Sequence, residues 1–468
     1  MRVIYREKQI TKVEKMLQEN NQAKREYTPG GYRQVWILSY PIVITMISQT
    51  IMGLASTIML GRLSTAQLGA AGLGGIIMWT FFSFFNGLLS SANTFIAQDY
   101  GAKEYKNIGK MMWYYIYISI ASYLLLFSLL FTINPILNLI NSSAEVTSYS
   151  NTYIRIRFYS GIGVFVSFAL SGFFRGIGDT KTPMYVAIIS NVVNLILSYI
   201  LIFGKYGFPR LEIAGASISN GIASILSGLM LFVVCLSKNN NRDYATRSFY
   251  RIELSLVRRI VWVGAPMGVQ FLLDNGSFSL FSAFIARMGD APLAANNAAI
   301  SIMSTSFMPL VGISIGASIL VGQYIGSKEI NYAKKSGYTA IKFGFIYAGS
   351  IAACFFIFPK QLLGLVSKDA DVINLGAKVL MLAGIFQISD AFGICSNGAL
   401  RGAGDTRFTM LIGLSYAWFL FIPLAYFFGF TLHGGIAGAW LGATIYIILY
   451  GVTVFIRFRR GKWESIKI

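Results

Sequence analysis

The feature that most constrains this chain is a series of long segments with almost no charge. A helix that crosses a hydrocarbon layer roughly 30 Å thick needs about 20 apolar residues, and each segment is close to that length or longer. Segment 408–456 is long enough for two crossings. We therefore predict an all-α polytopic membrane protein with twelve transmembrane helices in two six-helix lobes. The segments are 34–61, 63–98, 111–144, 158–174, 182–204 and 213–237 in the first half, and 260–286, 291–327, 343–359, 379–400 and 408–456 in the second.

Composition excludes the other main classes of protein. Only 12% of the 468 residues are charged and 55% are apolar, whereas a soluble domain carries roughly 25% charged residues. The net charge of +20 would favour nucleic acid only as a basic face on a soluble fold, so we expect no nucleic-acid partner. With one histidine and three scattered cysteines, the chain offers no catalytic or metal-binding cluster. It is not expected to be an enzyme.

Basic residues predict the orientation. With these boundaries, 30 of the 39 Lys and Arg fall on the side of the two termini, and such an excess marks the cytoplasmic side. We expect a multi-pass protein of the cell (plasma) membrane with both termini in the cytoplasm. The predicted parts are a tail (1–33), an N-lobe (34–237), a linker (238–259), a C-lobe (260–457) and a second tail (458–468).

The two halves resemble each other at an offset near 225 residues. Arg175-Gly176-Ile177-Gly178-Asp179-Thr180 corresponds to Arg401-Gly402-Ala403-Gly404-Asp405-Thr406, and the stretches from Ala97 and Gly322 also match. Six crossings per repeat make the repeats parallel, an arrangement that transporters use to move two bundles about a central site. We expect the arginines of the two loops to have mainly structural roles.

Two acidic residues are predicted within the membrane, both in the second half: Asp274 and Asp390. Ionisable groups at this depth are costly and tend to be functional. Gln270 shares a helix face with Asp274, whereas Gln387 and Asn397 share one with Asp390. The helix over 291–327 adds Asn296 and Asn297. The alternative is that the amides only join helices to one another, but an unpaired carboxylate is costly for that purpose.

The paired RGxGDT loops carry a family resemblance. Together with Met59-Leu60-Gly61-Arg62-Leu63, they resemble the multidrug and toxic compound extrusion (MATE) family, over about residues 34–457, and the NorM-type branch in particular. The resemblance implies a Na⁺- or H⁺-coupled antiporter that exports organic cations by alternating access of the two lobes. It also implies that Asp274 and Asp390 form the cation and substrate region, where they would hold Na⁺ if that is the coupling ion. No other cofactor is expected.

The first half departs from the family pattern. Ser56 stands where many members have Asp, and Asn194 with Ser198 replaces an expected pair of asparagines. The position equivalent to Asp274 is Gln49. A serine cannot carry the negative charge that a cation site needs. We therefore treat Gln49, Ser56, Asn194 and Ser198 as secondary candidates and expect the N-lobe site to be lost or reduced.

Two alternatives remain open at this stage. A flippase of the same superfamily, for lipid-linked oligosaccharide or a lipid, would need basic residues at cavity depth, where only Arg155 and Arg157 come close. An integral membrane enzyme would need a nucleophile or metal constellation that the sequence does not show. The expected partners are the lipid bilayer and small organic cations. One duplicated chain can form a complete unit, so we expect a functional monomer.

Overall fold

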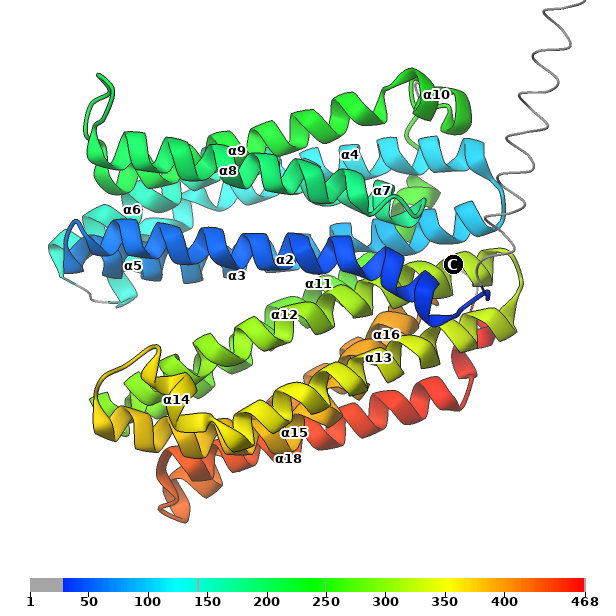
Figure 1. Ribbon diagram of the computed structural model, residues 1–468. Helices are drawn as coiled ribbons and strands as arrows, with labels where there is room; N and C mark the ends of the chain where they lie inside the picture. Colours follow the sequence, from blue (N-terminus) through cyan, green and yellow to red (C-terminus); the bar gives the residue numbers. More distant parts are fainter. Residues whose placement is uncertain (1–27, 141–142, 249, 467–468) are drawn as a thin grey trace, which may run out of the picture.

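The computed structural model describes residues 28–140, 143–248 and 250–466. In these residues the chain forms helices and turns and no strand. Most of the predicted N-terminal tail (1–27) and the last two residues of the C-terminal tail lie outside the described residues. Figure 1 shows two bundles of long helices, one from the blue-to-green half of the chain and one from the yellow-green-to-red half. The predicted all-α architecture is confirmed.

The N-lobe contains six crossings. Its helices α2, α3, α8 and α9 agree with the predicted segments, and α4 continues through a short 3₁₀ turn into α5. The fourth crossing is bent by 50° at Ser160, between α6 and α7. Counted as one span, this bent pair brings the candidate crossings from 11 to 12. The bounds are α2 Tyr32–Gly61, α3 Thr65–Gly101, α4 Tyr105–Ser128, α5 Ile133–Ile140, α6 Ala144–Tyr159, α7 Gly161–Gly176, α8 Lys181–Phe203 and α9 Glu212–Cys235.

The C-lobe repeats this order after the short helix α10 (Lys238–Tyr244). The eleventh crossing of the chain is irregular. A π-helical turn at Ala417–Phe421 separates α16 from α17, and a second one at Phe427–Thr431 follows α17. The predicted lobe boundaries stay predictions. The bounds are α11 Leu254–Ala286, α12 Asp290–Gly326, α13 Ile330–Ile357, α14 Pro359–Gly364, α15 Ala370–Gly402, α16 Thr406–Tyr416, α17 Ile422–Tyr426 and α18 Gly435–Arg459.

Equivalent positions of the internal repeat have the same backbone conformation. Lys103 and Lys328 occupy equivalent turns, and both have a φ of 62°. Gly178 and Gly404, the second glycines of the two RGxGDT loops, have φ of 89° and 87°. Only glycine adopts this left-handed region without steric cost, which explains why both loops carry a glycine at that position.

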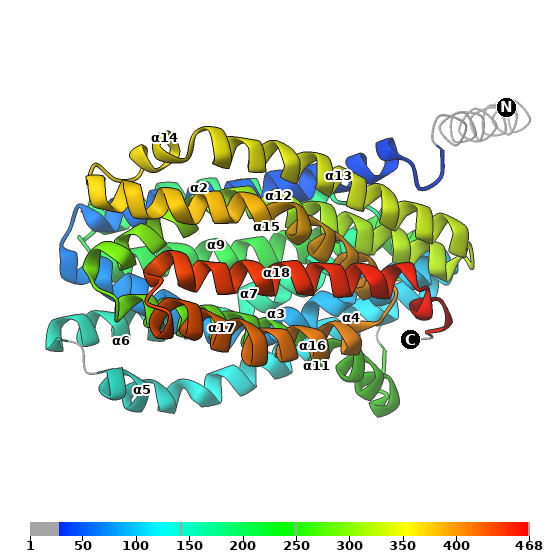
Figure 2. The same cartoon turned by 90° about the horizontal axis from the view of Figure 1, so that it is seen from below.

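The lobes contact each other at one end of the molecule, which we call the basic end and which holds the turns at Lys103 and Lys328 and the C-terminus. Helices α3 and α11 stay in contact farther along, where the Trp79 indole donates to the Asn275 side-chain oxygen at 3.1 Å. In Figures 1 and 2 the helices run roughly parallel to one axis, with α10 and the C-terminus at the basic end and α14 at the opposite, far end. In the first view the ribbons of the two lobes diverge toward the far end. The basic end of α2 packs into the C-lobe core, with Ile42 in the same buried cluster as Ile313.

Contacts between the lobes at the basic end follow the repeat. The Gln98 side chain of α3 donates to the Gly402 carbonyl (3.0 Å), and the equivalent Gln323 side chain of α12 donates to the equivalent Gly176 carbonyl (2.9 Å). Asn93 bonds to its own repeat equivalent, Ser318, at 3.2 Å. The matching stretches that begin at Ala97 and Gly322 therefore form the contact between the two repeats at this end.

Candidate functional site

A polar network crosses the interior of the C-lobe between α11, α15 and α18. The Tyr450 hydroxyl accepts hydrogen bonds from the side-chain amides of Asn397 (2.7 Å) and Gln270 (3.4 Å). The Gln270 side-chain oxygen accepts one from the Arg401 guanidinium at 2.9 Å. The same guanidinium lies 4.8 Å from the ring centroid of Phe271, within cation–π range. One tyrosine thus joins three helices.

Small residues allow this close assembly. A Cβ at Gly413 of α16 would lie 3.2 Å from the amide nitrogen of Gln270, and one at Gly393 would lie 3.0 Å from the Cα of Gly451. The first glycine lets α16 approach the network, and the second lets α15 and α18 touch along their backbones. Close helix approach through small residues is typical of membrane bundles.

The two acidic residues lie on the far side of this network. Asp274 is one turn (about 6 Å) beyond Gln270 on α11, and Asp390 is about 10 Å beyond Asn397 on α15, from the helical rise. Both are half-buried. Tyr446, one turn from Tyr450 on α18, lies close enough to interact electrostatically with both carboxylates. The order along the lobe, starting from the basic end, is Arg401, the tyrosine-centred network, Asp274 and then Asp390.

The two carboxylates have no polar side-chain partner among the described residues. Across the described residues, no side chain donates a hydrogen bond to either acid, and neither acid forms an ion pair within 4.0 Å. Asp274 interacts electrostatically with Arg401 without touching it. Such a pair of carboxylates beside amide and hydroxyl oxygens can hold a proton, a sodium ion or an organic cation.

The structure places the other C-lobe candidates differently. Asn296 is buried nearer the far end, where its side-chain oxygen accepts a hydrogen bond from the Trp440 indole at 3.0 Å. Asn297 is exposed. Gln387 is buried on the face of α15 that carries Asp390, and its amide nitrogen has no hydrogen-bond partner in the described part of the chain. Only Gln270 and Asn397 among the predicted amides join the network beside the acids.

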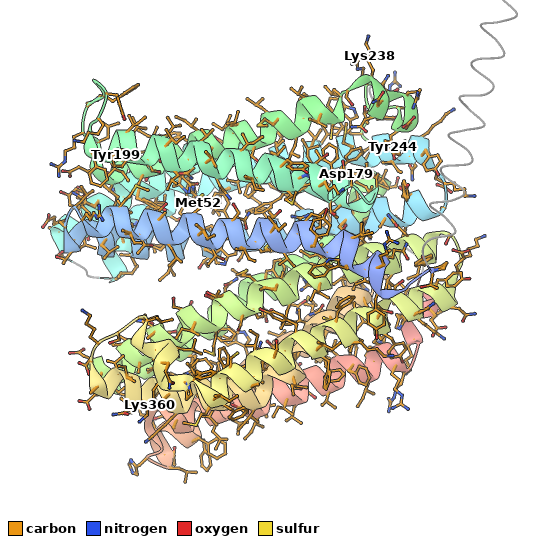
Figure 3. The ribbon with its side chains drawn as sticks, viewed as in Figure 1. Met52, Asp179, Tyr199, Lys238, Tyr244 and Lys360 are labelled. Carbon is orange, nitrogen blue, oxygen red and sulfur yellow. The ribbon has the colours of Figure 1, made fainter. Side chains whose placement is uncertain are left out.

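Two of the N-lobe candidates, Asn194 and Ser198, belong to a neutral cluster. Asn194 donates to the sulfur of Met52 (3.3 Å) and accepts from Ser198 (2.8 Å), which also bonds to Ser219 at 2.6 Å. Figure 3 labels Met52 on α2. Ser56 is half-buried and Gln49 is exposed. The structure therefore brings Asn194 and Ser198 together in a satisfied hydrogen-bond chain and adds no charge to it.

Sequence reasoning missed Arg401 and Tyr450 as parts of the site. Arg401 was expected to serve its loop, yet its side chain turns back along α15, as helical side chains tend to do, and reaches α11. The signal was its position four residues after Asn397 on the same face. The loop itself is held by Asp405, which pairs with Arg457 of α18 at 2.8 Å.

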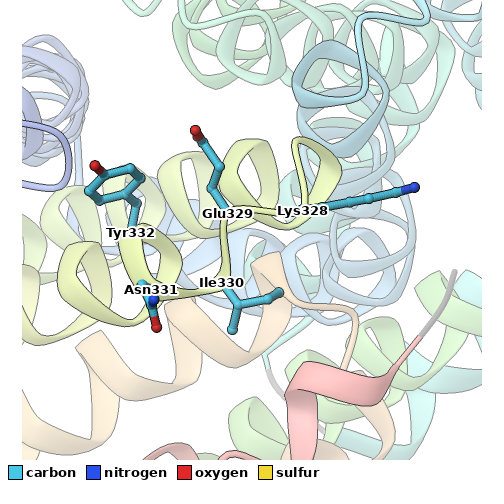
Figure 4. Close-up of a pocket in the computed structure, with 5 residues that line it drawn as sticks. All are labelled: Lys328, Glu329, Ile330, Asn331 and Tyr332. Atoms are coloured by element: carbon cyan, nitrogen blue, oxygen red, sulfur yellow. The ribbon is translucent and has the colours of Figure 1, made fainter.

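A surface hollow lies away from these acids. It has a volume of about 420 Å³ and is lined by residues of the turn between α12 and α13 at the basic end, from Lys328 to Tyr332 (Figure 4). Its residues are Lys328, Glu329, Ile330, Asn331 and Tyr332, which alone do not form a recognition site. No cluster of three or more His, Cys, Asp or Glu capable of holding a metal occurs in the described residues.

The fold and the site define a polytopic helical transporter built from two duplicated lobes. The family model described as MatE matches residues 41–200 and 266–427, which is most of the chain. The chain therefore belongs to the MatE family, whose members are transporters and not enzymes.

Relatives match along nearly the whole length. The chain is 26% identical over 450 residues to a probable multidrug resistance protein NorM of Thermotoga maritima, covering 95% of this chain and 96% of the relative. It is 27% identical over 436 residues to a protein of the same name from Mannheimia succiniciproducens, covering 92% and 94%. The predicted resemblance to NorM-type transporters is confirmed.

Solved structures share the fold. An outward-facing multidrug resistance MATE transporter of the MOP superfamily superposes with a TM-score of 0.81 at 20% identity, covering 93% of this chain and 97% of that one. A MATE transporter in the straight conformation gives a TM-score of 0.83 at 19% identity, covering 92% and 95%. A MOP superfamily transporter from Pyrococcus furiosus, whose binding pocket is described as having reversed polarity, gives 0.82 at 20% identity and covers 93% and 97%.

Proposed function

We propose that this MatE-family transporter exports organic cations of several kinds across the plasma membrane in exchange for inward Na⁺ or H⁺. The observation that carries the proposal is the pair of half-buried carboxylates, Asp274 and Asp390, which lie inside the C-lobe without a hydrogen bond in the described residues. Its relatives bear the name probable multidrug resistance protein NorM, which supports the export of several drugs.

Exchange follows from competition for negative charge. A coupling ion and an organic cation both favour the site with the acids ionised and unoccupied, so binding of one disfavours the other. Net exchange then requires that the two ligands favour different facings of the lobes. The inter-lobe contacts at the basic end, centred on Gln98 and Gln323, would hold one of these facings.

The coupling site is proposed to lie in the C-lobe alone. The N-lobe cluster of Asn194, Ser198 and Ser219 is neutral and internally hydrogen-bonded, so it offers no charge for an ion to neutralise. We further propose that the basic end faces the cytoplasm, because most Lys and Arg lie there, and that one chain is the transport unit.

Efflux of a fluorescent organic cation from energised vesicles tests the proposal. Asp274→Asn and Asp390→Asn keep side-chain volume but remove the charge, and each is expected to lower efflux at least ten-fold. Ser56→Ala in the N-lobe and Asn297→Ala, at an exposed amide on α12, are the matched controls and should retain it. Normal efflux in both aspartate variants would contradict the proposed site. Absence of efflux from the wild type under Na⁺ and pH gradients would favour the lipid flippase.

A further inference from the structure

The unexpected member of the C-lobe network is Arg401, a cation that interacts electrostatically with Asp274, one of the two acids proposed to bind cations. Its guanidinium is fixed by the Gln270 side-chain oxygen at 2.9 Å and by the Phe271 ring at 4.8 Å. Its Nε atom is buried without a hydrogen-bond partner among the described residues. An arginine in a membrane protein interior is costly unless it is paired or has a function.

Arg401 offsets part of the negative charge of the carboxylates without forming an ion pair with them. Gln270 is one turn nearer the basic end than Asp274. The guanidinium therefore lies on the basic-end side of the Asp274 carboxylate and interacts with it electrostatically from beyond ion-pair distance. Formally, two carboxylates and one guanidinium leave a single negative charge. That charge matches one monovalent cation.

We propose that Arg401 is a specificity-determining residue that sets the C-lobe site to prefer singly charged over doubly charged organic cations. The inference rests on the proposed function. A guanidinium at a fixed place also repels a second positive charge on the ligand, with a strength that depends on the distance between the two charges. A dication therefore loses more binding free energy than a monocation of the same shape. Arg401 acts on charge selection and is not needed to contact the ligand.

The N-lobe supplies a matched control. Arg175 occupies the equivalent place in the first RGxGDT loop, but the positions equivalent to Gln270 and Asp274 are Thr45 and Gln49. Thr45 donates to the Pro41 carbonyl of its own helix at 2.8 Å. Arg175 forms no ion pair in the described part of the chain. Replacing Arg175 removes the same side chain from the same motif, away from the acids.

Ethidium and propidium form a suitable probe pair, because they share the phenanthridinium ring and carry one and two fixed positive charges. We would measure their dissociation constants by fluorescence polarisation with the purified full chain in detergent. One unit charge at about 8 Å, through an effective dielectric constant of about 30, corresponds to about a ten-fold change in affinity. In Arg401→Gln the affinity ratio of propidium to ethidium should rise about ten-fold. Arg401→Lys, which keeps the charge, and Arg175→Gln should keep the wild-type ratio.

The ratio of the propidium affinity to the ethidium affinity separates charge selection from a structural role. Partial unfolding of a variant lowers the binding of both dyes equally and leaves this ratio unchanged. An unchanged ratio in Arg401→Gln, or an equal loss of both ligands, would overturn the inference. If that variant aggregates, Gln270→Leu removes the acceptor that holds the guanidinium and should shift the ratio in the same direction by a smaller factor. An unchanged ratio there would overturn the inference as well. A wild type that binds neither dye would refute the proposed function, and with it this inference.

Discussion

The contact between the lobes at Gly101 leads to a sharp prediction about conformational change. A Cβ atom at Gly101, the last residue of α3, would overlap the carbonyl oxygen of Gln323 on α12, and the neighbour is backbone that cannot rotate away. Gly326 meets the carbonyl of Gln98 in the same way. Gly101→Ala should therefore push the lobes apart at the basic end without disturbing either lobe internally.

The size of the effect follows from the contacts that separate. Overpacking of this kind costs about 1–3 kcal/mol, and each hydrogen bond lost between the lobes, such as Gln98 to Gly402 or Gln323 to Gly176, costs about 1 kcal/mol. Part of the strain is relieved as the bonds break, so we expect about 2–3 kcal/mol against this conformation. That is about a 30- to 150-fold shift in its population.

Distances between spin labels at the far end would report the shift. Tyr206 and Leu432 lie in far-end turns of opposite lobes and are 84% and 57% exposed, so labelled cysteines there should not disturb packing. Cys235, Cys354 and Cys395 are replaced by alanine in every variant, because Cys235 and Cys395 are buried in the core. Gly101→Ala should transfer much of the population to a shorter distance. Gly72→Ala, on the same helix but with no atom within 4 Å of the new Cβ, should match the wild type. A folded Gly101→Ala protein with the wild-type distance distribution would refute this account of the contact.

Two further predictions concern single contacts of the C-lobe. Tyr450→Phe removes the acceptor shared by Gln270 and Asn397 and should lower stability by about 1–3 kcal/mol, seen as a lower thermal unfolding temperature. Tyr446→Phe, whose hydroxyl makes no hydrogen bond in the described residues, should have a smaller effect, and equal effects would argue against the network. Asp405→Asn breaks the pair with Arg457, whose side chains are 6% and 21% exposed, and should cost about 2 kcal/mol in the same assay. Asp243→Asn at the exposed pair with Arg242 should cost nearly nothing, and a similar cost at both pairs would contradict the role of burial.

Much of the fold could be predicted because membrane segments are long and uniform. The crossings, the duplication and the asymmetry of Asp274 and Asp390 all follow from residue types at fixed spacing. The bend at Ser160 and the π-helical turns around Pro423 did not follow, because they depend on local backbone geometry. A proline in such a helix is tolerated when neighbours satisfy the freed groups.

The site was only partly predictable for a related reason. Helical periodicity places Gln270 with Asp274 and Arg401 on the face of Asn397, but it does not tell how far a long side chain reaches, so the contact of Arg401 with α11 could not be predicted. Asn296 and Asn397 are the same residue type on neighbouring crossings, yet one bonds to Trp440 and the other to Tyr450. The difference depends on how far each lies from the basic end in the assembled lobe.

The central claim is that cation entry and organic-cation export are one coupled process at the C-lobe acids. Its most direct test is made in proteoliposomes that hold the purified chain, with an imposed Na⁺ gradient or an imposed pH gradient and no other driving force. The account predicts that one of these gradients drives uphill movement of ethidium, that an outward ethidium gradient drives the same ion inward, and that Asp274→Asn abolishes both fluxes. Ethidium movement that ignores both gradients, or coupled fluxes that persist in Asp274→Asn, would contradict it.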